Sequence, residues 1–143
     1  MKENAENKGL EIAESYGLSL TKRSISLLKV IEAQPGSTVS PRTPPRASIP
    51  NVLIYKVMGK MFAIMSIRGN EEVILKCDAN RALFLREQYE GIGHRSHLDP
   101  RTWINVKLDS GIPTNEIKKM VVHSYQQVCA KLTKKQIADL LDL

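Results

Sequence analysis

Three histidines are the residues that could ligate a metal or act as a general base: His94, His97 and His123. His94 and His97 are three residues apart in an expected strand, so their side chains point to opposite faces, which is poor geometry for one metal ion. His123 falls on the polar flank of an expected helix, where a surface position is the simplest interpretation. The sequence therefore predicts no metal site and no cofactor.

Motifs for nucleophilic or phosphate chemistry are also missing from the sequence. No G-x-S-x-G pattern provides a nucleophile, and neither G-x-G-x-x-G nor a Walker A pattern is present around Gly91 and Gly93. The paired carboxylates Glu71 and Glu72 fall in an expected turn and are predicted to be solvated. These residues therefore do not indicate a reaction.

The remaining residues that could contact a ligand are cationic and lie beside expected strands and turns. Lys/Arg side chains at hairpins can contact a phosphate backbone, and a tryptophan lies near them in the sequence. The alternative interpretation is that turns are polar in any protein and that the tryptophan belongs to the core. The residues are Lys60, Arg68, Arg95, Arg101, Trp103 and Lys107, with a further cluster at Lys131, Lys134 and Lys135.

The formal net charge of +6 is unevenly distributed. Residues 17–68 carry eight Lys/Arg against the single acid Glu32. Such a positive region can attract nucleic acid or another polyanion, although a moderate basic excess also occurs in proteins that bind neither.

The central stretch, residues 52–78, has the pattern of a three-stranded antiparallel meander with breaks at Gly59 and Gly69. Strict alternation in the second strand places Phe62 and Ala63 on opposite faces. Asp78 predicts the N-cap of a helix over 79–89. Two further strands are expected over 92–98 and 103–108, joined by the turn 99–102. The expected fold class is α+β, with about five antiparallel strands and helices on one face.

Helices are expected at both ends of the chain, over 4–16, 18–33 and from Thr114 onward, with a last one after a capping box at Thr133. Residues 35–50 contain five of the seven prolines and predict a linker without helix or central strand. The expected organisation is a helical N-terminal extension (1–34), a proline-rich linker (35–50) and an α+β domain (51–143). No apolar run is long enough for a membrane span and no secretory signal is visible, so a cytoplasmic location is expected.

Five ordered motifs resemble the MmcQ/YjbR family of small bacterial proteins over about residues 51–136. They are Lys56-Val57-Met58-Gly59-Lys60-Met61-Phe62-Ala63, Leu75-Lys76-Cys77-Asp78, Leu85-Arg86-Glu87-Gln88-Tyr89, His97-Leu98-Asp99 leading to Trp103-Ile104, and Ser124-Tyr125 leading to Lys131-Leu132-Thr133-Lys134-Lys135.

The resemblance implies a fold similar to that of bacterial frataxin (CyaY-like) and a non-enzymatic role, with DNA bound through two hairpin wings. Carried over to this chain, it implies the nucleic-acid-binding residues Lys60, Lys76, His97, Arg101, Trp103 and Lys107. The second hypothesis is a protein-interaction module that uses the N-terminal extension and the proline-rich linker to bind a partner chain. The oligomeric state does not follow from the sequence.

Overall fold

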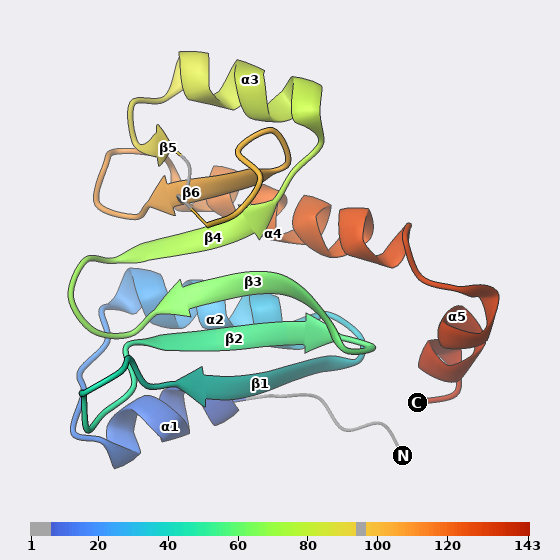
Figure 1. Cartoon of the computed structure of the whole chain (residues 1–143). Helices are drawn as coiled ribbons and strands as arrows, with labels where there is room; N and C mark the ends of the chain where they lie inside the picture. The colour runs from blue at the N-terminus through green and yellow to red at the C-terminus, as the bar shows by residue number, and fades with distance from the viewer. Residues whose placement is uncertain (1–6, 94–96) are drawn as a thin grey trace.

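The structure is a computed structural model that describes residues 7–93 and 97–143, and its centre is a six-stranded antiparallel sheet (Figure 1). The strand order is β1-β2-β3-β4-β6-β5, and helices α2 and α4 pack on one side of it. The expected α+β class with helices on one face is thus confirmed, with six strands in place of about five. The strands are β1 (Ser37–Arg42), β2 (Val52–Val57), β3 (Lys60–Ser66), β4 (Glu72–Lys76), β5 (Ile92–Gly93) and β6 (Trp103–Lys107). The helices are α1 (Lys8–Ser15), α2 (Lys22–Ala33), α3 (Ala79–Gln88), α4 (Thr114–Cys129) and α5 (Lys134–Leu141).

Strand β1 lies within residues 35–50, where the sequence predicts a linker, and that prediction is wrong for residues 37–42. The strand is at the sheet edge and pairs with β2 alone. The Arg42 carbonyl accepts a hydrogen bond from Asn51 N–H at 3.1 Å. Because successive residues of a strand alternate in direction, the nitrogen of Pro41 lies on the outer side. An edge strand tolerates a proline there, since no bond to its neighbour is lost.

The strand predicted over 92–98 is shorter than expected. Strand β5 contains Ile92–Gly93, residues 94–96 lie outside the described part of the chain, and His97 is in a turn. The turn predicted at 99–102 is confirmed by a hydrogen bond from Thr102 N–H to the Asp99 carbonyl at 3.1 Å.

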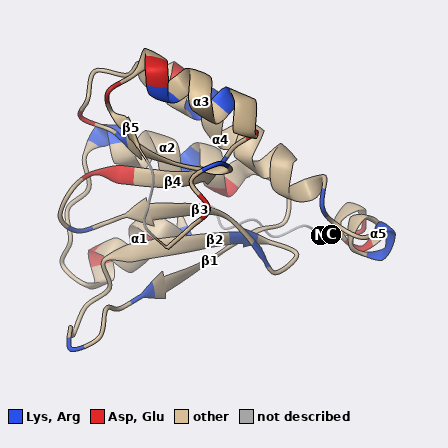
Figure 2. Ribbon diagram, turned by 45° about the horizontal axis from the view of Figure 1, so that its top comes forward, with Lys and Arg blue, Asp and Glu red and all other residues tan. Residues whose placement is uncertain are grey.

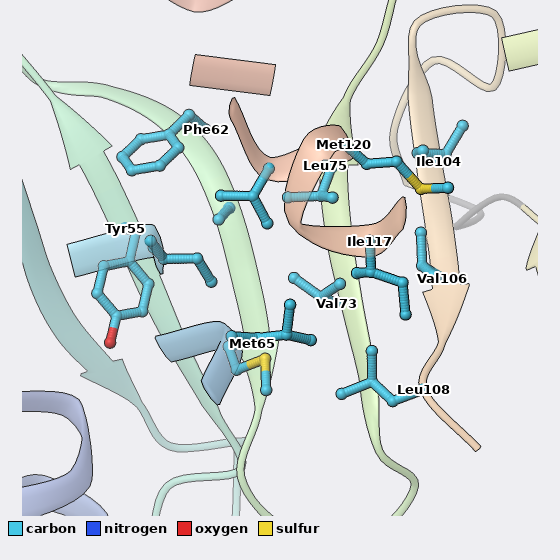
Figure 3. Close-up of a cluster of buried hydrophobic side chains, with 14 of the residues drawn as sticks. Tyr55, Phe62, Met65, Val73, Leu75, Ile104, Val106, Leu108, Ile117 and Met120 are labelled. Atoms are coloured by element: carbon cyan, nitrogen blue, oxygen red, sulfur yellow. The ribbon is translucent and has the colours of Figure 1, made fainter. Parts of the chain in front are cut away.

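The helix-facing side of the sheet forms the core, and a β-bulge between β2 and β3 adds a residue to it. The register shifts after Tyr55, which leaves Phe62 as the extra residue of β3. Phe62 and Ala63 are therefore both fully buried, although strict alternation places them on opposite faces. The Phe62 ring meets Tyr125 of α4 edge to face, with centroids 5.4 Å apart. In Figure 3 the core side chains of the sheet surround α4; those labelled are Tyr55, Phe62, Met65, Val73, Leu75, Ile104, Val106 and Leu108, with Ile117 and Met120 of α4.

Ser124 of α4 connects the helix to the sheet at this bulge. Its hydroxyl accepts a hydrogen bond from Lys76 N–H at 2.8 Å and donates one to the Phe62 carbonyl at 2.6 Å. Lys76 and Phe62 stand opposite each other, one step beyond the paired residues Leu75 and Ala63. The buried hydroxyl therefore replaces a bond of the β3–β4 ladder and fixes the position of α4.

Glu32 of α2 is a buried carboxylate that holds α1 against the sheet. Its Oε2 accepts hydrogen bonds from Gly9 N–H at 2.9 Å and from the Tyr55 hydroxyl at 2.5 Å. The N-cap residue of α1, Asn7, makes no side-chain cap bond, so Glu32 satisfies an otherwise free amide of the first turn. Burial raises the pKa of Glu32, although both hydrogen bonds act in the opposite direction.

A second carboxylate, Glu71, holds the β3–β4 turn against the start of α2. It accepts hydrogen bonds from the Thr21 hydroxyl, from Ser24 Oγ at 3.1 Å and from Arg23 Nη2 at 2.9 Å. The hydrogen bond from Thr21 is the main cause of the lowered pKa of Glu71. Glu32 lies in the last turn of α2 and Glu71 binds its first turn, and we call these two contact sites together the N-terminal corner.

Candidate functional site

The sheet has a second side, opposite α2 and α4, that no described helix covers, and we call it the uncovered face (Figure 1). Residues paired across neighbouring strands share a face. Leu53, Tyr55, Val73 and Leu75 belong to the core side, so the alternating positions belong to the uncovered face. Those positions include Arg42 of β1, Ile54 and Lys56 of β2, Met61 and Ile64 of β3, Glu72, Ile74 and Lys76 of β4, and Trp103, Asn105 and Lys107 of β6.

Cations outnumber acids on this face. Among the described strand residues of this face, Arg42, Lys56, Lys76 and Lys107 stand against one acid, Glu72, which pairs across the strands with Lys107. Figure 2 shows basic (blue) segments and no acidic (red) ones on β1 and β2. The ammonium groups of the three lysines form no hydrogen bond or salt bridge with any described residue, so they remain available to an anion.

Lys76 and Trp103 form a pair at one end of the uncovered face. They are direct cross-strand partners, and Lys76 Nζ lies 5.0 Å from the centroid of the Trp103 ring. Arg86 of α3 donates to the Trp103 carbonyl at 2.7 Å and to the Gly93 carbonyl at 3.3 Å, which fixes the start of β6. Trp103 is half-buried, so it is neither a core residue nor a fully exposed one.

Residues 97 and 98 of the segment before β6 lie over the uncovered face, and a groove lies between them and the β1–β2 loop. The groove has a volume of about 490 Å³ and an apolar floor that includes Ile54, Met61 and Ile64. Arg42 and His97 stand among the residues that line it. This arrangement offers an apolar surface beside a cation and a histidine ring.

Arg101, in the same connection, is occupied by a neighbour. Its Nη2 and Nε donate to the two carboxylate oxygens of Asp99 at 3.0 and 3.2 Å. Both side chains are exposed, and the pairing raises the pKa of Arg101 and lowers that of Asp99. Arg101 is therefore a weaker candidate for an incoming anion than the lysines of the face.

Lys60 is separated from the other predicted residues. It pairs with Val57, whose side chain faces the helices, and its Nζ lies 3.5 Å from the Lys131 carbonyl. Lys107 ends β6, and β3 and β6 run in the same direction because both are antiparallel to β4. Lys60 and Lys107 thus lie at opposite ends of the sheet, whereas Lys76, Trp103 and the His97 loop share the uncovered face.

Sequence reasoning did not place Arg42 and Lys56 among the site residues. Lys56 interrupts an apolar strand at a position that alternates with the core residues Tyr55 and Val57, and this pattern could have identified it as a residue of the uncovered face. Arg42 could not be placed, because the strand that carries it was predicted as a linker.

Among the described residues, no group of three or more His, Cys, Asp or Glu side chains could hold a metal ion. Cys77 is unsuited to nucleophilic attack, because burial raises the pKa of its thiol to about 11. Within the described chain no helix is both long and apolar enough to cross a membrane.

Comparison with known proteins identifies relatives over most of the chain. The model of the YjbR family matches residues 33–127, which includes β1. The uncharacterized protein YjbR from Escherichia coli K12 is 29% identical over 118 residues, which cover 82% of this chain and 96% of that protein. The protein of the same name from E. coli O157:H7 matches equally well.

Two solved structures have the same fold. The crystal structure of Deinococcus radiodurans protein DR2400, with a DUF419 domain, is 27% identical with a TM-score of 0.68, covering 80% of this chain and 84% of that one. The crystal structure of a Pseudomonas syringae protein is 22% identical with a TM-score of 0.50, and the match covers 62% of this chain and 86% of the P. syringae chain. This similarity supports the fold alone.

Proposed function

The chain belongs to the YjbR family, and we propose that it is a cytoplasmic, non-enzymatic protein that binds DNA through backbone phosphates on the uncovered face of its sheet. The observation that supports this proposal best is that Lys56, Lys76 and Lys107 form no salt bridge with any described residue on a face that no described helix covers, with Lys76 directly beside Trp103.

The proposed contact surface differs from the two hairpin wings that the sequence predicts. Lys56 on β2 and Lys76 on β4 would neutralise phosphates. Binding is then favourable because the neutralised phosphates release their condensed counterions. Lys107 contributes less, since its cross-strand partner is Glu72. Lys60 lies outside this surface.

A single strand fits the uncovered face better than a duplex does. Proteins that bind single strands on a sheet combine a basic surface with aromatic side chains on which bases stack. Trp103 is half-buried and lies at one end of this face beside Lys76, and His97 could offer a second ring. In a duplex the bases are already stacked, and the open face of a sheet offers no element that enters a groove.

Fluorescence anisotropy tests the proposal with a labelled single-stranded oligonucleotide and its duplex, titrated with the full chain between about 50 and 200 mM salt. The single strand should bind more tightly, with a negative slope of log K against log salt. The variant Lys56→Glu/Lys76→Glu should weaken binding about tenfold or more.

The matched control is Lys8→Glu/Lys22→Glu, which changes the net charge equally at two exposed positions in the first turns of α1 and α2. Equal losses in both double variants would mean that only the total charge matters. Absence of binding at the lowest salt would exclude this function.

The protein-interaction hypothesis remains a prediction with a narrower basis. The described part of residues 1–34 contributes Ala13, Leu27, Leu28 and Ile31 to the same core as the sheet. A partner that binds there would meet only the outer faces of α1 and α2.

A further inference from the structure

A shallow pocket opens on the helical side, where α2, α3 and α4 meet. It has a volume of about 380 Å³. Val30 of α2 and Val122 of α4 supply apolar surface, and Val122 remains 36% exposed. Arg81, Lys118 and His123 line it as well. The uncovered face is on the other side of the sheet, so this pocket is distinct from the proposed DNA surface.

The charge of the pocket lining is entirely positive. Lys119 is the third cation, and it contacts Glu116 at 3.3 Å. Arg81 and Lys118 form no salt bridge with any described residue. Asp78, an acid beside Arg81, uses its carboxylate to accept a hydrogen bond from Arg81 N–H at 3.2 Å and so caps α3.

His123 is fixed in the pocket wall by the backbone. Its Nε2 accepts a hydrogen bond from Asp78 N–H at 3.1 Å, so this nitrogen carries no proton and the Nδ1–H is the donor of the ring. The sequence predicts a simple surface position for His123, and the structure shows a half-buried residue instead. Burial, and secondarily Arg81, lower its pKa, so the ring is neutral near pH 7.

The combination of valines and cations limits the kind of ligand. A bare inorganic anion would gain nothing from Val30 and Val122, and the pocket is too open to enclose it. A peptide with apolar and acidic side chains would bury the valines and pair with Arg81 and Lys118. Helix-in-groove recognition uses the same combination of apolar anchors and complementary charge.

We propose that the pocket formed by Val30, Arg81, Lys118, Val122 and His123 binds an acidic amphipathic segment of a partner protein. An apolar side chain of the segment contacts the two valines, while its carboxylates contact Arg81 and Lys118. Lys119 contributes after leaving Glu116, an exposed pair that costs little to break.

The test uses a fluorescein-labelled synthetic helix of leucine and glutamate, titrated with the full chain. Micromolar affinity is expected. The variants Lys118→Glu and Val122→Asp should each weaken binding about tenfold, while Lys134→Glu/Lys135→Glu on α5 should leave it within about twofold. Circular dichroism and thermal unfolding verify that each variant is folded.

Two further probes separate docking from general charge attraction. A peptide with the same glutamate content but no leucine should bind at least about tenfold more weakly, and single-stranded DNA should not displace the amphipathic peptide. The proposal is overturned by equal binding of the two peptides, by equal loss in the α5 control, or by no binding at about 1 mM peptide. Displacement by DNA would also overturn it, because the two surfaces would then be one.

Discussion

The N-terminal corner and the uncovered face use charged side chains in opposite ways. In the corner, the carboxylates of Glu32 and Glu71 accept hydrogen bonds that join helices to the sheet. On the uncovered face, the lysines at positions 56, 76 and 107 make no such bonds within the described chain. The two acids of the corner therefore support the fold, while the three lysines of the face remain available to a ligand. A substitution should affect stability in the corner and affinity on the face.

The largest expected effect is the loss of Glu32. The substitution Glu32→Ala leaves Gly9 N–H and the Tyr55 hydroxyl buried without their acceptor, which should lower the unfolding free energy by about 3 kcal/mol. Urea denaturation at pH 7 measures it. A loss below about 1 kcal/mol would mean that water or another group replaces the carboxylate.

The next effect concerns the close approach of α1 at Gly9. A Cβ at this position would lie 2.7 Å from Glu32 Oε2 and 2.9 Å from Leu53 Cδ1, and it would also meet the Tyr55 hydroxyl. Gly9→Ala should therefore destabilise the protein by about 2 kcal/mol. Combining it with Tyr55→Phe should recover part of the loss, since the hydroxyl is removed. A strictly additive double-mutant cycle would contradict the proposed clash.

The two corner carboxylates should also respond oppositely to pH. Because the folded-state pKa of Glu32 is raised above 4.5, its contribution to stability decreases as the pH rises from 4.5 through the raised value. The folded-state pKa of Glu71 is lowered below 4.5, so its contribution is present above 4.5 and is lost as the pH falls. Urea unfolding of the wild type, Glu32→Gln and Glu71→Gln on both sides of pH 4.5 measures how each contribution to stability changes with pH. The same pH trend for both carboxylates would contradict this prediction.

Smaller stability effects are expected on the uncovered face. Lys56→Gln should change the unfolding free energy by less than about 0.5 kcal/mol. Lys76→Gln removes the contact with Trp103 and should cost up to about 1 kcal/mol. Each should weaken binding of single-stranded DNA several-fold. Urea unfolding and anisotropy on the same samples measure the two effects, and a large loss of stability in Lys56→Gln would remove the contrast with the corner.

The smallest expected effect belongs to Arg101. Because Asp99 already binds its guanidinium, Arg101→Ala should change DNA affinity by less than about twofold. Asp99→Asn frees the guanidinium and should increase affinity slightly. Anisotropy at low salt compares the two, and a large loss in Arg101→Ala would show that the pair opens on binding.

Strand alternation and helix caps in the sequence predicted most elements of the sheet and two of the helices. The alternation of apolar residues identified β2, β3, β4 and β6, and the caps at Asp78 and Thr133 marked α3 and α5 correctly. Strand β1 was missed because its pairing with β2 outweighs a composition rich in proline. The bulge at Phe62 was missed because it depends on how two strands pair.

The candidate site was predictable only in part. Lys76 and Trp103 were identified by the family resemblance, but their contact follows from the β4–β6 register, which the sequence does not specify. Lys60 was placed with them although it faces the helical side, since the bulge changes the phase of β3. Glu32 gave no signal, because a single acid in a helix of mixed pattern is usually exposed.

Pro41 has a consequence for the behaviour of the protein at high concentration. The outer edge of β1 could otherwise accept a strand from another molecule, which is how sheets begin to aggregate. The outward-facing nitrogen of Pro41 has no hydrogen to donate, so a ladder between molecules would lack a hydrogen bond near the end of β1. Pro41, which made β1 difficult to predict from the sequence, therefore also disfavours edge-to-edge association between molecules.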